Sequence, residues 1–134
     1  MMMRLFGLFT IFLAATTTAA LGDSVAGQYE YMNNCAACHG EAATGDGPLV
    51  TFFKEPVPDL TRLSRDNDGD FPFHETLMIV DGRAGLRGHG DVMPVWGDTF
   101  QRAEMAQAGD DESYLVSQGR LLSLVEYLVT VQQD

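Results

Sequence analysis

Apolar residues recur at helical spacing near the end of the chain. Between residues 111 and 132 an apolar stripe is formed by Leu121, Leu124, Val125, Leu128 and Val129. Spacings of three and four residues place such side chains on one face of an α-helix. The pattern therefore predicts an amphipathic helix over 111–132 whose apolar face packs against a core.

A second helix is predicted at the other end, over residues 24–37, with Asp23 or Ser24 as its N-cap. Gly27 and Tyr31 lie four residues apart in this segment and therefore share one face of the helix.

Between these helices the pattern favours turns and short helices. Asp59 is expected to cap a helical turn that runs to Arg65, and an acidic, solvent-exposed turn follows over 66–70. A helix should then begin within 71–73 and end near residue 82. The polar segment 102–112 is predicted to be an inserted surface loop. No alternation typical of a strand occurs, so the expected fold is all-α and a single domain.

Residues 1–22 have the organisation of an export signal. Arg4 supplies the positive n-region, residues 5–15 form an apolar run, and small residues lead to a cleavage point after Ala20 or after Gly22. The apolar run is shorter than the ~20 residues that span a bilayer as a helix. We therefore predict a cleaved signal peptide and a periplasmic location, with an uncleaved membrane anchor facing the periplasm as the alternative.

The predicted mature domain, residues 23–134, is strongly acidic. Removal of the signal peptide takes away Arg4 and no acid, which leaves seven basic and nineteen acidic side chains and a formal net charge of −12. Such a surface repels nucleic acid and anionic lipid headgroups. We expect no nucleic-acid binding, no stable membrane insertion after cleavage, and protein partners with a basic docking patch. A purely solubilising role of the charge is the alternative.

Both cysteines of the chain fall in one short motif, Cys35-Ala36-Ala37-Cys38-His39. Cys-x-x-Cys-His is the attachment signature of c-type haem. Two thiols one helical turn apart can each bond a haem vinyl group, and His39 then lies beneath the iron as an axial ligand. A thioredoxin-like pair would follow a strand, and a structural zinc site would need four ligands. The helical pattern before Cys35 and the lack of a second cysteine pair argue against both.

Four segments make the chain resemble the class I cytochrome c family, in its bacterial, single-haem form. They are residues 27–34 leading into the haem motif, residues 40–48, Met93-Pro94-Val95-Trp96-Gly97, and the C-terminal apolar helix with Tyr127. The resemblance covers nearly all of 23–134. It implies that the N- and C-terminal helices cross, with Tyr127 beside Gly27 and Tyr31, and that short helices and loops surround one haem.

The resemblance also implies that Met93 is the distal iron ligand. A thioether sulfur is a soft ligand that binds ferrous iron well and raises the reduction potential. Pro94 restricts Met93 to an extended conformation, so this residue should lie on a loop. Two other ligands remain open: His89, which would give a bis-His haem, and Met78, whose apolar surroundings are more typical of a core residue.

Three further residues are expected to support the haem. By resemblance, the carbonyl of Pro48 accepts a hydrogen bond from the ring of His39 and fixes its tautomer. Trp96 should either donate its indole N–H to a haem propionate or pack against the ring edge. Arg83 should either pair with a propionate, because a guanidinium matches a carboxylate bidentately, or lie on the surface.

The expected function is electron transfer on one haem c, attached through Cys35 and Cys38 and ligated by His39 and Met93. Six-coordinate iron leaves no open site for a substrate, so the protein should be a carrier and not an enzyme. One alternative is a haem c subunit of a dedicated oxidoreductase complex, such as a sulfur-compound or alcohol dehydrogenase. Another is a haem enzyme or sensor with an open distal site.

Overall fold

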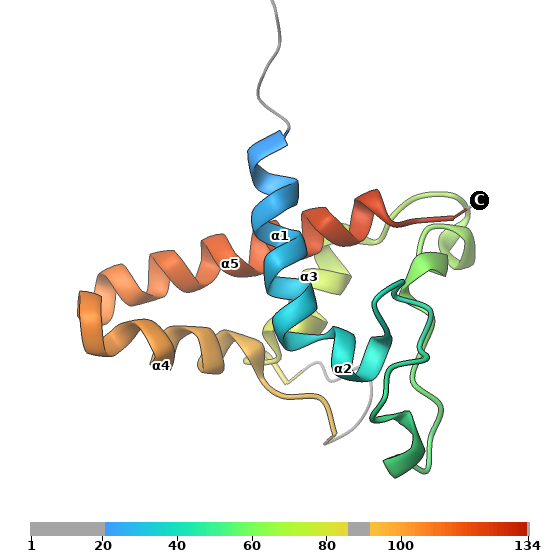
Figure 1. Cartoon of the computed structure of the whole chain (residues 1–134). Helices are drawn as coiled ribbons and strands as arrows, with labels where there is room; N and C mark the ends of the chain where they lie inside the picture. Colours follow the sequence, from blue (N-terminus) through green and yellow to red (C-terminus); the bar gives the residue numbers. More distant parts are fainter. Residues whose placement is uncertain (1–20, 86–91, 134) are drawn as a thin grey trace, which may run out of the picture.

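The computed structural model describes residues 21–85 and 92–133, which are built from helices and loops without a strand (Figure 1). This confirms the all-α class that the sequence predicts. The predicted signal peptide, apart from its last two residues, and the segment that holds His89 lie outside the described residues.

Five α-helices and three short 3-10 helices make up the described chain. The α-helices are α1 (Leu21–Asn34), α2 (Ala36–His39), α3 (Phe73–Asp81), α4 (Trp96–Ala108) and α5 (Asp110–Thr130). The 3-10 helices are η1 (Val50–Phe52), η2 (Leu60–Arg62) and η3 (Arg65–Asn67). The first and last α-helices correspond to the two predicted from the pattern. However, α1 begins before Asp23 and Ser24, so neither residue is its N-cap.

The N- and C-terminal helices cross, as predicted (Figure 1). A Cβ added at Gly27 would clash with the carbonyl oxygen of Ser123 and would lie 2.8 Å from the Cβ of Tyr127. The missing side chain therefore lets the two backbones approach closely. Next to this point the rings of Tyr31 and Tyr127 pack with their centroids 5.3 Å apart.

The core lies between α1, α3, α4 and α5. Its buried apolar residues are Tyr31, Ala36, Ala43, Val80, Phe100, Leu121, Leu124, Val125 and Leu128. Four of the five residues in the predicted stripe of α5 are therefore buried. The fifth, Val129, is 42% exposed, which corrects the prediction. It follows Leu128 by one residue, a rotation of about 100° that turns its side chain out of the core face.

The predicted surface loop over 102–112 is wrong, because this segment is helical. α4 continues to Ala108, and α5 begins at Asp110 and runs back antiparallel to α4 (Figure 1). Gly109 alone joins them, with a φ of +77° that favours glycine. α4 is amphipathic: Phe100, in its first half, is 1% exposed and packs into the core. The polar residues that follow belong to the same helix and do not indicate a loop.

The middle of the chain follows the predicted order. The Asp59 carboxylate accepts hydrogen bonds from the Thr61 N–H (2.9 Å) and hydroxyl (2.6 Å), so it caps η2 as expected. Residues 66–70 are exposed. α3 ends at Asp81 and is followed by Gly82 as its C-cap, which takes the left-handed conformation with a φ of +70°. Within the described residues, no helix is both long and apolar enough to cross a membrane.

Candidate functional site

One cavity of about 420 Å³ lies where three segments meet: the end of α1 with α2, the loop over 52–58, and the strap over 92–96 that leads into α4. Its lining consists of Asn34, Cys35, Cys38, His39, Phe52, Phe53, Lys54, Glu55, Pro56, Val57, Pro58, Val92, Met93, Pro94 and Trp96. The structure therefore brings five of the seven predicted site residues around a single cavity. The two exceptions are Pro48 and Arg83.

A smaller apolar cavity of about 140 Å³ extends from the same place into the core. It shares Cys35, His39, Pro58 and Met93 with the larger one. Its other walls are core residues of α1, α3 and α5 and of the chain around η2. Cys35, His39 and Met93 thus lie on the boundary between the larger, more open cavity and the apolar core.

Helical hydrogen bonding positions the Cys-x-x-Cys-His motif. The N–H of Cys35 donates to the Tyr31 carbonyl (2.8 Å), and the N–H of His39 donates to the Cys35 carbonyl (2.8 Å). The two thiols consequently lie about one turn apart on the same side of the chain. His39 ends α2 and is only 7% exposed, so its imidazole is held within the cavity wall.

The His39 ring meets the carbonyl of Pro58, which corrects the expectation of Pro48. Its Nδ1 lies 3.3 Å from the Pro58 oxygen, a distance suited to a ring N–H that donates to the carbonyl. The loop that holds Pro48 packs on the backbone of the motif instead: the N–H of Gly47 donates to the Cys38 carbonyl (3.1 Å). The resemblance indicated the right kind of partner but the wrong proline.

Met93 and Trp96 both line the cavity. Met93 lies in a non-helical segment, is half-buried, and lines both cavities. Trp96 opens α4 and packs on Phe100, with ring centroids 5.6 Å apart. In contrast, Met78 lines neither cavity, although it was an alternative ligand. The other alternative, His89, lies outside the described residues.

Arg83 is directed to a protein carboxylate and not to the cavity. Its Nε and Nη2 donate to the two carboxylate oxygens of Asp81 (2.6 and 2.7 Å), and its Nη1 donates to Gln101 (2.9 Å). A Cβ at Gly97 would clash with this ion pair, so the glycine gives the pair its place against α4. An acid two residues away thus fills the guanidinium fork, and Arg83 is a partly buried residue of the α3–α4 junction that does not line the cavity.

Several cavity residues were not predicted as site residues. Phe52 is 79% exposed and Phe53 half-buried, and both line the cavity together with Val57 and Pro58. The signal for this wall was its composition, since three apolar residues and two prolines fall within the seven positions 52–58. Asn34 was missed because it is a polar residue at the end of a helix, and the sequence does not show whether such a residue faces a cavity or the solvent.

Burial changes the acid–base behaviour of two groups beside the cavity. Burial, with smaller contributions from Cys38 and Glu30, raises the pKa of the Cys35 thiol to about 12. Burial also raises the pKa of the Tyr31 hydroxyl well above its ordinary value, and this hydroxyl donates to the carbonyl of Gly40 (2.7 Å). Both groups are therefore uncharged at neutral pH in the folded chain.

The donor set fits haem c. Two thiols are available for the vinyl groups, an imidazole and a thioether are available for the iron, and the remaining walls are mostly apolar. The cavity volume also falls in the range of roughly 300–1,000 Å³ that is usual for small-molecule and cofactor sites. Within 21–85 and 92–133, no group of three or more His, Cys, Asp and Glu side chains is placed to hold a bare metal ion.

Comparison with known families agrees with this geometry. The model of the family described as Cytochrome c matches residues 24–132, which is most of the chain. No curated protein and no solved structure gives a significant match.

Proposed function

Because the chain belongs to the cytochrome c family, we propose that it carries single electrons in the periplasm on one haem c, with His39 and Met93 as the axial ligands. Proteins of this family are haem-binding electron-transfer proteins and hold haem c covalently. The observation that carries the proposal is the shared cavity lined by Cys35, Cys38, His39 and Met93.

Each of these residues has a separate task. Cys35 and Cys38 would hold the porphyrin through thioether bonds, and His39, oriented by the Pro58 carbonyl, would present its other ring nitrogen to the iron. Met93 would present a soft sulfur that favours the reduced state. Bound haem supplies a one-electron Fe(III)/Fe(II) couple. The protein positions and shields the group and performs no bond-making of its own.

The route of the electron is proposed to be the open side of the cavity. Phe52, Val92 and Pro94 line the cavity and are themselves exposed, so they form an apolar rim at its mouth. Lys54 and Glu55 lie on the same rim. Redox partners usually form small, short-lived contacts, and a rim of this kind suits them. The acidic net charge of the chain would favour a partner with a basic patch.

An absorption spectrum of protein purified from a host with haem-attachment machinery tests the proposal. We expect a haem-stain signal on the denatured chain, a low-spin spectrum, and a weak red-edge band in the oxidised form that reports sulfur ligation. Met93→Ala should abolish that band and retain the covalent haem. Met105→Ala, whose side chain is 45% exposed on α4, is the matched control and should leave it intact.

Four results would overturn the proposal in whole or in part. A chain without haem stain would exclude covalent attachment, and a high-spin native spectrum would exclude six-coordination. If His89→Ala, and not Met93→Ala, changed the ligand signature, the axial pair would be bis-His. Carbon monoxide binding to the reduced native protein at neutral pH would support a haem enzyme or sensor instead.

A second candidate is a haem c subunit of a dedicated oxidoreductase complex, and one observation favours it. The outer face of α5 carries Leu115, Leu122 and Val129 at seven-residue spacing, with exposed fractions of 69%, 41% and 42%. Gly119 lies between them with open space around it. Such a face is typical of a helix that packs on another subunit. A stoichiometric partner that co-purifies with the native protein but not with Leu115→Lys/Leu122→Lys would select this candidate.

A further inference from the structure

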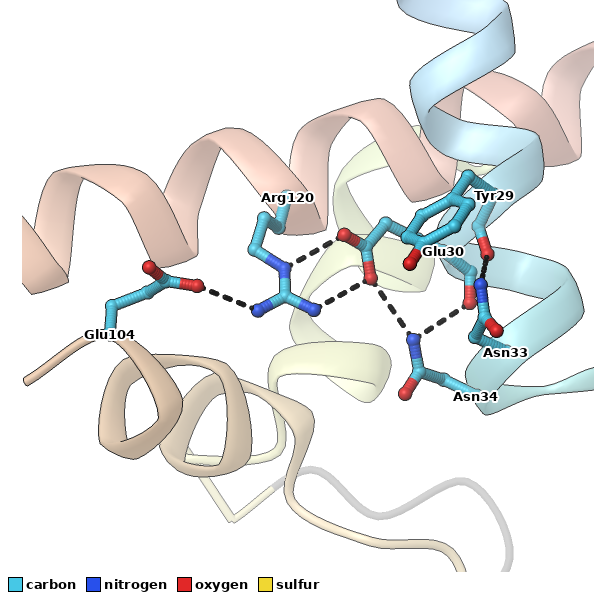
Figure 2. A network of polar contacts seen from close by, with 6 residues as sticks. All are labelled: Tyr29, Glu30, Asn33, Asn34, Glu104 and Arg120. Carbon is cyan, nitrogen blue, oxygen red and sulfur yellow. Dashed lines mark hydrogen bonds and ion pairs between the residues drawn. The ribbon is translucent and has the colours of Figure 1, made fainter. Parts of the chain in front are cut away.

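An arginine joins α1, α4 and α5 at one point (Figure 2). The Nε and Nη2 groups of Arg120 donate to the two carboxylate oxygens of Glu30, at 2.8 and 2.9 Å. Its Nη1 donates to the carboxylate of Glu104 at 3.0 Å. One guanidinium therefore serves two carboxylates, and its contact with Glu30 is bidentate, the stronger of the two geometries.

The two carboxylates differ in burial. The Glu30 side chain is 10% exposed and that of Glu104 is 25% exposed, so Glu30 is the inner acid and Glu104 the outer one. Arg120 lies over the ring of Phe100, with its Cζ 4.1 Å from the centroid. Because little water reaches Glu30, its negative charge is balanced mainly by the guanidinium of Arg120.

The network reaches both walls of the proposed haem cavity. The side-chain amide of Asn34 donates to Glu30, to its carboxylate at 3.0 Å and its carbonyl at 2.8 Å, and Asn34 lines the cavity (Figure 2). On the other side Phe100 packs on Trp96, which also lines the cavity. A single side chain therefore separates Arg120 from each of these cavity residues: Glu30 lies between Arg120 and Asn34, and Phe100 lies between Arg120 and Trp96.

The charge of Glu30 acts at the haem-attachment motif. Glu30 lies five residues before Cys35, and its carboxylate accepts a hydrogen bond from Asn34, which lines the cavity together with Cys35. Oxidised haem carries one more positive charge than reduced haem. A carboxylate beside it therefore stabilises the oxidised form and lowers the reduction potential, unless a cation cancels its field.

We propose that Arg120 is the charge-balancing residue of the haem site: it neutralises Glu30, which the fold buries beside the attachment motif, and so keeps the reduction potential high. This rests on the proposed haem-carrying function. Arg120 acts through Glu30, Asn34 and Phe100 and lines neither cavity, so it is a positioning residue and not a ligand.

Redox titration of the haem-loaded protein and five variants at pH 7 tests the proposal. Arg120→Gln should lower the potential, because the carboxylate of Glu30 then has no cation to balance it. Glu30→Gln should raise it, and Glu30→Gln/Arg120→Gln should return it close to the native value. Arg120→Lys should keep the potential near native while the protein loses thermal stability, because the charge stays and the fork is lost.

Glu104→Gln is the matched control, because this acid also bonds Arg120 but lies on the outer side. It should shift the potential upwards by less than Glu30→Gln does. If Arg120→Gln does not fold, Glu30→Gln and Arg120→Lys still decide the matter. The proposal is overturned if Glu30→Gln leaves the potential unchanged or lowers it, or if Arg120→Lys shifts the potential as far as Arg120→Gln does.

These outcomes separate this proposal from the proposed function. Absence of the haem stain from the native protein contradicts the proposed haem carrier, and absence of the red-edge band contradicts its proposed Met93 ligand. Intact haem and an intact band in every variant, with potentials that do not follow the charge, contradict only the role of Arg120.

Discussion

At the scale of single residues, two glycines on the crossing helices have opposite surroundings. Gly27 faces Ser123 and Tyr127 of α5 at a distance that admits no Cβ, whereas Gly119 has no neighbour within 4 Å of the position its Cβ would take. The first is required by packing. The second costs α5 stability, because glycine within a helix is roughly 1 kcal/mol less favourable than alanine.

We therefore expect opposite effects from the same substitution. Gly27→Ala should lower the free energy of unfolding by about 1–3 kcal/mol, the usual effect of overpacking, whereas Gly119→Ala should raise it by up to roughly 1 kcal/mol. Urea unfolding of the haem-loaded protein measures both. Equal changes of the same sign would contradict the close crossing at Gly27.

Tyr31 should make the free energy of unfolding decrease at alkaline pH. Burial raises the pKa of its hydroxyl, so the folded chain keeps a proton that the unfolded chain releases near pH 10. The contribution of the buried hydroxyl to the free energy of unfolding is therefore fully present below about pH 10 and is lost as the pH rises further. Tyr31→Phe should cost roughly 0.5–1.5 kcal/mol at pH 7 through loss of the bond to the Gly40 carbonyl.

The measurement is urea unfolding between pH 7 and 11. Tyr31→Phe should lose less stability than the native protein over pH 10–11. Tyr29→Phe is the control, since Tyr29 is 67% exposed on the same helix. If the native protein and Tyr31→Phe declined in parallel, the buried hydroxyl would not be the source of the pH dependence.

At the scale of elements, the Asp81–Arg83 pair joins the end of α3 to α4. Arg83 bonds Asp81 through two donors and Gln101 of α4 through a third. These hydrogen bonds hold the pKa of the Asp81 carboxyl below its ordinary value. Because α4 begins directly after the Met93 segment, this junction also supports the strap that carries the proposed ligand.

Arg83→Gln should therefore destabilise the protein by roughly 1–3 kcal/mol at pH 7, the cost of unpairing a partly buried charged group. Arg62→Gln should change stability by no more than about 1 kcal/mol, because its pair with Asp66 is exposed, with side-chain fractions of 48% and 57%. Urea unfolding compares them. Similar small losses in both would show that the α3–α4 junction does not depend on the ion pair.

The depressed pKa of Asp81 also fixes the pH range of this effect. The stability that the pair provides is present above the ordinary pKa of aspartate and is lost as the pH falls through the lower folded value. The difference between native protein and Arg83→Gln should therefore narrow below about pH 4. A constant difference down to pH 2 would contradict this origin.

At the scale of the whole molecule, the predicted net charge of −12 for residues 23–134 should govern encounters. Cationic reagents should be attracted and anionic ones repelled, and salt should weaken both effects. Electron exchange with hexaammineruthenium should slow with rising ionic strength, and exchange with ferricyanide should accelerate. Stopped-flow rates between 10 and 500 mM salt measure this. Rates that do not change with salt would exclude electrostatic steering.

The sequence by itself determined whatever depends on near neighbours along the chain. The spacing of Leu121, Leu124 and Leu128 predicts α5, and the motif from Cys35 to His39 predicts covalent haem, because both are set within a few helical turns. Asp59 as a cap is equally local. The all-α class follows from these patterns, since no segment alternates as a strand does.

Only the tertiary structure decided which distant groups meet. Pro48 and Pro58 are equally suitable acceptors in the sequence, and the path of the chain places Pro58 beside His39. Arg83 has a carboxylate two residues away that satisfies its donors before any propionate. The polar segment 102–112 is helical because α4, which contains most of it, packs against α5. Partner choice depends on three-dimensional proximity, and a local pattern does not contain that information.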